Sequence, residues 1–181
     1  MAGHVFKSGI DLFRLSQKYL TYIDIVTHEQ QFYFDTVDNI KDFINDIALE
    51  VATEHDRVED LKTCLINCPL SLIENHFRFA LREIIENAFK FSPKGSNVDI
   101  EMLEQEDKCQ IIINDNGVGF PEGAVSRINA FQQFSAGSFS RKGVGLGLFL
   151  AGRIIEKNQG IMNIYSVPNE GTKVIIIVPS V

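Results

Sequence analysis

The chain has 181 residues, 45% of them hydrophobic, which is enough to bury one substantial core with room for a small additional segment. Its formal net charge of -7 argues against nucleic-acid binding, because a phosphate backbone attracts basic surfaces. No apolar run approaches the roughly 20 residues of a membrane-spanning helix. We therefore expect no membrane contact by this chain and a cytoplasmic location, which leaves open a membrane-anchored parent protein.

The three cysteines, Cys64, Cys68 and Cys109, have no regular spacing. An odd number without a secretory signal is typical of reduced thiols in the cytoplasm. Cys64 and Cys68 can be combined with His76 as metal ligands, but a fourth ligand is missing. We therefore favour buried structural thiols over a metal site.

Apolar residues recur every seven positions in residues 5–26, in the series Val5, Leu12, Tyr19, Val26 and the adjacent series Phe6, Phe13, Leu20. This pattern predicts one long helix with a wide apolar face. One helix cannot bury such a face alone, so we expect a partner helix, either in a second copy of the chain or in a segment outside this sequence. The alternative is a helix that folds back on its own domain.

The segment that follows predicts a strand and then helices. Aromatic alternation in residues 31–36 indicates a short strand, and Thr36 or Asp38 can cap the next helix. Apolar residues at helical spacing over 40–52 predict an amphipathic helix that lies on a sheet. Residues 56–66 can supply one or two strands. Pro69 and Ser71 then indicate the start of a helix over 72–91.

The helix over 72–91 carries two stripes. The core stripe consists of Ile73, Phe77, Ala80, Leu81, Ile84, Ile85 and Ala88. Glu83, Asn87 and Lys90 form a neighbouring stripe. These three resemble parts of a metal-phosphate site, in which the Asn oxygen binds Mg²⁺, Lys binds phosphate and Glu orients or deprotonates a nucleophile. The alternative is a solvated helix face with an ordinary ion pair.

Two strands then lead into a glycine-rich segment. Residues 98–102 and 109–113 predict a hairpin, and Asp115, Gly117 and Gly119 follow it directly. Asp115 can accept a hydrogen bond from an exocyclic amine, and the glycines allow the main chain to approach a ring or a phosphate. The alternative is an ordinary turn.

A second glycine cluster, Gly143, Gly145 and Gly147, precedes a helix that is predicted to end near Gly160. Glycines before a helix leave free N–H groups that suit phosphate, although neither cluster is a Walker P-loop or a dinucleotide fingerprint. The segment between the clusters has helical potential over 124–134 and looks like a mobile cover, from which Arg127, Arg141 and Lys142 can close onto phosphates. Residues 161–167 and 172–178 predict a final hairpin.

Taken in order, these elements resemble the catalytic ATP-binding domain of sensor histidine kinases, in the GHKL ATPase superfamily. Residues 83–92 look like the N box of that family, 115–120 its first glycine box, 131–134 its F box and 143–148 its second glycine box. The resemblance implies an α+β two-layer sandwich of the Bergerat type, a mixed or antiparallel sheet with helices on one face, preceded by one long helix. It divides the chain into residues 1–29, similar to part of a dimerisation hairpin, and the catalytic domain, 30–181.

The resemblance also implies roles for individual residues. Asp115 would read the adenine amine, Asn87 would hold Mg²⁺, and Glu83, where many of these kinases carry Asn, would orient the nucleophile or accept its proton. The expected ATP-binding residues are Asn87, Lys90, Asp115, Gly117, Gly119, Phe134, Arg141, Lys142, Gly143, Gly145, Leu146 and Gly147.

The chain departs from the family at the phosphoacceptor. The family carries this histidine in a first helix, whereas His28 and Glu29 lack the residues that normally follow, and His55 and His76 lie in the ATP-binding part. We therefore expect the acceptor on a histidine-bearing helix of the parent kinase outside this chain, with a response regulator receiver domain as a further partner and a homodimer through residues 5–26. The alternatives are a degenerate nucleotide-binding scaffold, or a serine kinase or ATPase of the same superfamily.

Overall fold

The computed structural model describes residues 34–121, 123–125 and 146–181, together with Gly9, Phe13, Ser16, Leu20 and Ile23. The chain divides into two compact units, Met1–Phe32 and Tyr33–Val181. In the first unit the five described residues are helical, and the side chains of Phe13, Leu20 and Ile23 are exposed. The rest of the helix predicted over 5–26 lies outside the described residues.

The second unit is built on a five-stranded sheet in the order β2, β4, β5, β7, β6. Its strands are β2 (Leu61–Cys64), β4 (Val98–Gln105), β5 (Lys108–Asp115), β6 (Ile161–Val167) and β7 (Gly171–Pro179). β2 runs parallel to β4, and every other neighbouring pair is antiparallel. Both predicted hairpins are therefore confirmed: β6 has the predicted bounds, and β4, β5 and β7 are longer than expected.

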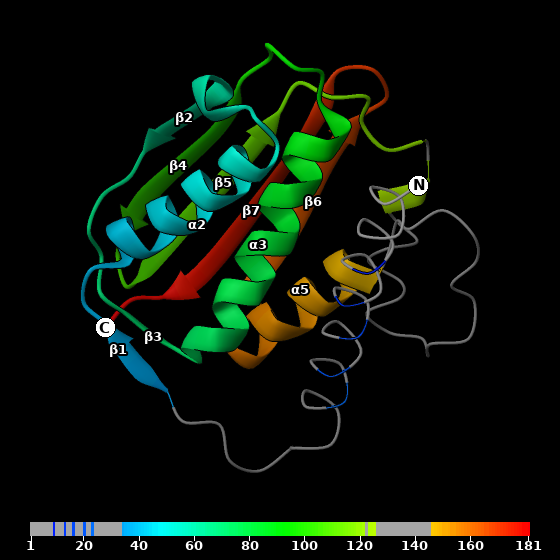
Figure 1. Ribbon diagram of the computed structural model, residues 1–181. Coiled ribbons are helices and arrows are strands. Elements are labelled where there is room, and N and C mark those ends of the chain that lie inside the picture. The colour runs from blue at the N-terminus through cyan, green and yellow to red at the C-terminus, as the bar shows by residue number, and fades with distance from the viewer. Residues whose placement is uncertain are drawn as a thin grey trace. The chain divides into compact units, whose positions relative to one another are not determined.

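Three helices cover one face of this sheet (Figure 1): α2 (Ile40–Glu54), α3 (Glu74–Phe91) and α5 (Leu146–Lys157). α3 lies between the other two and contacts both. The arrangement confirms the predicted two-layer α+β sandwich with a mixed sheet. No described helix is long and apolar enough to cross a membrane.

The core lies between the helices and the sheet. All the predicted core positions on α2 and α3 are buried, and so are alternate residues of the central strands, as expected for a sheet covered on one face. The buried strand residues are Val98, Ile100 and Met102 in β4, Cys109, Ile111 and Ile113 in β5, and Val174, Ile176 and Val178 in β7.

The helix predicted over 72–91 does not begin at Leu72, because residues 70–72 form strand β3 (Leu70–Leu72). They pair antiparallel with β1 (Asp35–Val37) in a separate two-stranded sheet. This pairing satisfies main-chain groups of β3, whose side chains Leu70 and Leu72 are fully buried. α3 begins only at Glu74, and the N–H of Ile73 is satisfied by the side-chain oxygen of Asn158, at 2.7 Å.

Three boundaries differ from the predictions. Asn39, not Thr36 or Asp38, caps α2, because its side-chain oxygen accepts a hydrogen bond from the N–H of Asp42, at 3.3 Å. The strand predicted over 31–36 covers 35–37 where it is described. The segment 56–66, predicted to supply one or two strands, contains a short 3₁₀ helix, η1 (Val58–Asp60), followed by the single strand β2. In the helix predicted over 124–134, Ala124 and Val125 are helical, and the remainder lies outside the described residues.

Candidate functional site

A cavity of about 420 Å³ opens between the C-terminal half of α3, the glycine segment after β5, and the turn between β6 and β7. Its size lies within the usual range for small-molecule sites. Four of its lining side chains are polar, those of Asn87, Asp115, Asn169 and Thr172. The others are apolar or glycine: Ile84, Ala88, Phe91, Ile113, Val118, Gly119, Phe120, Pro121, Leu148, Pro168 and Val174.

Asp115 is the buried charge of this cavity. It is the last residue of β5, its side chain is only 7% exposed, and its Oδ1 accepts a hydrogen bond from the N–H of Gly117, at 2.8 Å. Burial raises the pKa of Asp115 to about 6, although main-chain hydrogen bonds from Gly117 and Thr172 and the charge of Arg57 oppose the shift. A carboxylate held in this way presents its remaining lone pairs to whatever enters the cavity.

The glycine segment packs too closely for side chains at two positions. A Cβ at Gly117 would lie 2.5 Å from Asp115 Oδ1 and 2.5 Å from the carbonyl oxygen of Phe91. Gly119 has a φ of +63°, and a Cβ there would collide with the carbonyl oxygen of Val167. Both glycines are therefore required for the main chain to line the cavity, as their spacing predicted.

Hydrogen bonds from two directions anchor this segment. The N–H of Val118 donates to the carbonyl of Phe91 at the end of α3, at 3.1 Å. The carbonyl of Val118 accepts from the N–H of Asn169 in the β6–β7 turn, at 2.8 Å, and the N–H of Phe120 donates to Ser166 Oγ, at 2.8 Å. The segment thus ties helix α3 to the β6–β7 hairpin and forms one wall of the cavity.

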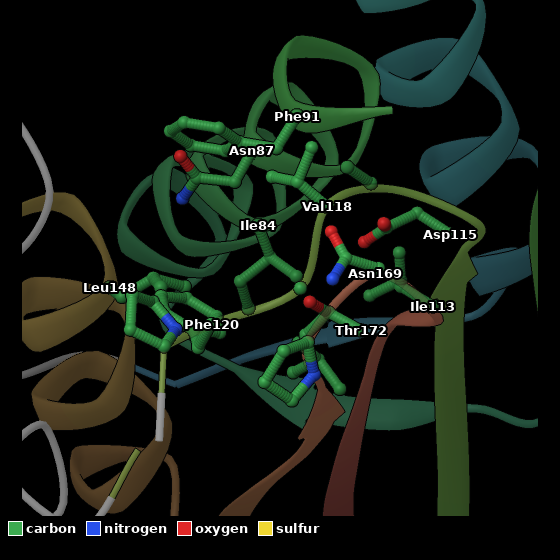
Figure 2. A pocket seen from close by; sticks show the side chains of 15 residues that line it. Ile84, Asn87, Phe91, Ile113, Asp115, Val118, Phe120, Leu148, Asn169 and Thr172 are labelled. Atoms are coloured by element: carbon green, nitrogen blue, oxygen red, sulfur yellow. The ribbon is translucent and has the colours of Figure 1, made fainter. Parts of the chain in front are cut away.

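Glu83, Asn87 and Lys90, the predicted polar stripe on α3, lie in three different surroundings. Asn87 lines the cavity, and Figure 2 shows it with Leu148 at the end away from Asp115. Lys90 is exposed and does not line the cavity; its ammonium lies 5.2 Å from the ring centroid of Phe91. Glu83 does not line it either.

Glu83 is 7% exposed, so the alternative of a solvated face is wrong for this residue. Its carboxylate packs against α5 so closely that a Cβ at Gly147 would collide with Glu83 Oε2. The packing of α5 on α3 causes this burial, which helical spacing alone does not reveal. It also explains why the second position of α5 is a glycine.

Several predicted nucleotide-binding residues lie outside the described residues, namely Phe134, Arg141, Lys142, Gly143 and Gly145. Leu146 is the first residue of α5, and its side chain is also outside the description. Among the described residues no group of three His, Cys, Asp or Glu side chains can hold a metal ion. Asn87, an amide, is a different kind of ligand and stays a prediction.

The sequence analysis missed Arg57, which is 6% exposed and hydrogen-bonds to the end of α3 and the loop that follows it. Its guanidinium donates to the carbonyl oxygens of Phe89, at 2.6 Å, and Ser92, at 3.0 Å, and to those of Pro93, at 2.8 Å, and Ser96, at 2.9 Å. Arg57 therefore satisfies the open C-terminal carbonyls of α3 and fixes the loop that follows. A single arginine in an irregular segment gave no sequence signal for this role.

The polar groups of the β6–β7 turn were also missed. Asn169 and Thr172 line the cavity, and Ser166 Oγ donates to the carbonyl of Gly171, at 2.8 Å. The available signal was the Glu170-Gly171-Thr172 turn, whose register places Thr172 opposite Asp115. The turn itself was predicted, but its proximity to Asp115 depends on the pairing of β5 with β7, which is distant in sequence.

Comparisons with known proteins agree with this geometry. The family described as histidine kinase-, DNA gyrase B-, and HSP90-like ATPase matches residues 73–181. Sensor protein DegM of Bacillus sp. strain B21-2 is 31% identical over 144 residues, which cover 75% of this chain and 37% of DegM. Sporulation kinase A of Bacillus subtilis strain 168 is 34% identical over 99 residues, 55% of this chain and 16% of that kinase. The chain thus spans well under half the length of these curated relatives.

Among solved structures, a mycobacterial sensor histidine kinase, MprB, superimposes with a TM-score of 0.68 at 20% identity, covering 81% of this chain and 97% of that one. At this identity the likeness shows the fold alone, and it is the fold that the resemblance implied. The chain belongs to the family of histidine kinase-, DNA gyrase B-, and HSP90-like ATPases, and it has the catalytic ATP-binding domain of a sensor histidine kinase.

Proposed function

We propose that this chain binds Mg-ATP in the cavity beside Asp115 and provides the catalytic part of a protein-histidine kinase, with the phosphoacceptor histidine elsewhere in the parent protein. The observation that carries the proposal is the position of Asp115, a buried acceptor at one end of a largely apolar cavity whose wall is glycine main chain. A flat base with an exocyclic amine fits this combination of an apolar slot and one oriented acceptor.

The cavity also has a direction that suits a nucleotide. Asp115 lies at one end, and Asn87 with Leu148 of α5 lies at the other (Figure 2). With adenine at Asp115, the phosphates extend toward Asn87 and the N-terminus of α5, where main-chain N–H groups and the helix dipole favour negative charge. In this orientation the adenine lies beside a hydrogen-bond acceptor, and the phosphates lie beside hydrogen-bond donors.

The residues of α3 would serve the triphosphate. The side-chain oxygen of Asn87 is a suitable ligand for Mg²⁺, which neutralises phosphate charge and orients the transferred group when it is bound. Lys90 is exposed at the end of α3 and its ammonium can reach a phosphate oxygen. We propose that Gly143, Gly145, Leu146 and Gly147 contact the phosphates, with Phe134, Arg141 and Lys142 contributing from the intervening segment.

For Glu83 we propose an orienting role in phosphoryl transfer. Its carboxylate is buried against Gly147, at the start of α5, and outside the cavity lining. From this position it fixes the beginning of α5 relative to Asn87, one turn further along α3, and so sets the geometry of the transferred phosphoryl group. Direct acceptance of the nucleophile's proton would require the Glu83 carboxylate to lie within hydrogen-bonding distance of a group inside the cavity, and Glu83 does not line the cavity.

The partners follow from the same proposal. The histidine would be carried by a helix of the parent kinase and would pass its phosphoryl group to a response regulator receiver domain. The exposed Phe13, Leu20 and Ile23 support a homodimer through residues 5–26, because an apolar helix face gains stability when a second helix covers it. We place the domain in the cytoplasm, where ATP and response regulators are available.

A transfer assay tests this function. The chain would be incubated with Mg²⁺ and ATP labelled at the γ-phosphate, with and without the histidine-bearing hairpin of a sensor kinase relative. The expected result is acid-labile label on the hairpin, absent with Asn87→Ala, and little phosphate release without the hairpin. Steady hydrolysis that the hairpin does not change would instead indicate the ATPase alternative. Nucleotide binding without either reaction would indicate the scaffold.

A further inference from the structure

Asn169, in the turn between β6 and β7, has an unusual and well-anchored backbone. Its φ is +64°, in the left-handed region that residues with a side chain rarely adopt and that Asn tolerates best after Gly. Its N–H donates to the carbonyl of Val118, at 2.8 Å, and the N–H of Glu170 donates to the carbonyl of Val167, at 3.0 Å. The residue is therefore held in a fixed position relative to the glycine segment.

The side chain of Asn169 faces the ligand cavity. It lines the cavity together with Asp115 and Thr172, and Figure 2 shows its amide at the same end as the Asp115 carboxylate. Within the described residues, this amide makes no hydrogen bond to another group of the protein. Asn169 is exposed, and an amide on the cavity wall that no protein group engages is available to hydrogen-bond a ligand.

The chemistry of the two side chains is complementary. The carboxylate of Asp115 can only accept hydrogen bonds, and it can take one hydrogen of an exocyclic amine. The amide of Asn169 both accepts and donates, which matches the other hydrogen of that amine together with an adjacent ring nitrogen. Asn pairs with adenine in this bidentate manner when proteins read the N6 and N7 atoms of the base.

We propose that Asn169 is a specificity-determining residue that reads the amine edge of adenine left open by Asp115. Its Oδ1 accepts the second N6 hydrogen, and its Nδ2 donates to the neighbouring ring nitrogen, N1 or N7. The inference rests on the proposed function, because it assumes that adenine occupies the Asp115 end of the cavity. It adds a second determinant of base selectivity, contributed by a turn distant in sequence from the glycine boxes.

The test combines a side-chain deletion with atomic deletions in the base. Asn169→Gly removes the amide and suits the left-handed backbone, so the fold is expected to persist. Binding of ADP, 1-deaza-ADP and 7-deaza-ADP would be measured by calorimetry for the wild type and this variant. Glu170→Gln, an exposed neighbour outside the cavity lining, is the matched control.

In the wild type, one of the two deaza analogues is expected to bind about tenfold more weakly than ADP, as expected for one bidentate contact. Asn169→Gly is expected to weaken ADP binding by about the same factor and to abolish the penalty for that analogue. Unchanged ADP affinity, or deaza penalties that persist in Asn169→Gly, would overturn the inference while leaving the nucleotide site in place. A folded wild type that binds no ADP would instead refute the proposed function itself.

Discussion

The carboxylate of Asp115 accepts a hydrogen bond from the main-chain N–H of Gly117, two residues further along, at 2.8 Å. A Cβ at Gly117 would lie 2.5 Å from the same carboxylate oxygen, so the close approach depends on the glycine. This pair links the end of a central strand to the wall of the cavity. It also orients Asp115, the only buried carboxylate among the described residues that line the cavity, and so sets the direction from which this carboxylate can accept a hydrogen bond from a ligand.

Nucleotide affinity is predicted to depend on the ionisation of Asp115. Burial raises the pKa of this carboxyl to about 6, and the proposed contact with an amine requires the ionised form. Below pH 6 the affinity should therefore fall by about tenfold per pH unit. Calorimetric titration with ADP between pH 5 and 8 measures this dependence. Asp115→Asn is the control, because the ADP phosphates titrate in both experiments but the Asp115 carboxyl is present only in the wild type. Parallel pH profiles for the two proteins would contradict the prediction.

The same carboxyl is predicted to make stability decrease as pH rises. Because its pKa is higher in the folded protein than the usual 3.8, the folded state retains a proton between pH 4 and 6 that the unfolded chain has released. The contribution is fully present below the unfolded pKa and is lost as pH rises through about 6, an effect on the order of 2 to 3 kcal/mol. Urea unfolding of the wild type and Asp115→Asn across this range isolates the contribution, and a wild-type stability that rises more steeply than that of the variant would exclude it.

Gly119→Ala is predicted to destabilise the chain more than Gly123→Ala. Both glycines have positive φ, +63° and +72°, so an alanine at either position costs about 1 to 2 kcal/mol of backbone strain. At Gly119 the new Cβ also collides with the carbonyl of Val167, whereas Gly123 has open space around it. Unfolding free energies of the two variants give the packing effect by difference. Equal decreases in unfolding free energy for the two variants would show that Gly119 is not closely packed against β6.

Arg57→Met is predicted to cost about 2 to 4 kcal/mol, because it leaves buried carbonyl oxygens at the end of α3 without donors. Arg153→Met is the control: that arginine forms an exposed ion pair with Glu156, worth about 0 to 1 kcal/mol. Thermal or urea unfolding compares the two. ADP affinity should also fall in Arg57→Met, since the carbonyl of Phe91 that anchors Val118 lies within the segment that Arg57 fixes.

Glu83→Gln is predicted to bind ATP normally and to transfer the phosphoryl group about 10- to 100-fold more slowly. The amide keeps the shape of the contact with Gly147, but it loses the negative charge that favours a fixed position of the first turn of α5 beside Glu83. Binding is measured by calorimetry and transfer by the labelled-hairpin assay. Intact phosphoryl transfer in this variant would remove Glu83 from the mechanism.

Much of the fold was predictable because the periodic patterns are long. The buried stripe of α2 and the alternation in β4 and β5 each repeat often enough to fix a helix or a strand. The strand at Leu70–Leu72 was missed because three residues carry little pattern and because their partner, β1, is distant in sequence: Leu72 pairs with Asp35, 37 positions earlier. Its assignment depends on tertiary pairing that a local reading does not contain.

The site was predictable where local motifs carry it and not where packing creates it. Asp115 and Asn87 line the cavity, and a local motif predicted each of them: the glycine segment for Asp115 and the helical stripe for Asn87. The burial of Glu83 depends on α5, and the function of Arg57 depends on loop carbonyls more than thirty residues away. Asn169 reaches the cavity only through the pairing of β5 with β7. These contacts arise from chain segments that no single motif connects.

Calorimetric titration with a non-hydrolysable ATP analogue tests the central claim most directly, with and without Mg²⁺. The wild type would be compared with Asp115→Asn and with Asp99→Asn, a matched carboxylate on β4 that does not line the cavity. We predict saturable binding that Mg²⁺ strengthens, a loss of about tenfold or more in Asp115→Asn, and wild-type affinity in Asp99→Asn. No binding to the folded wild type, or equal affinity in all three proteins, would contradict a nucleotide site at Asp115.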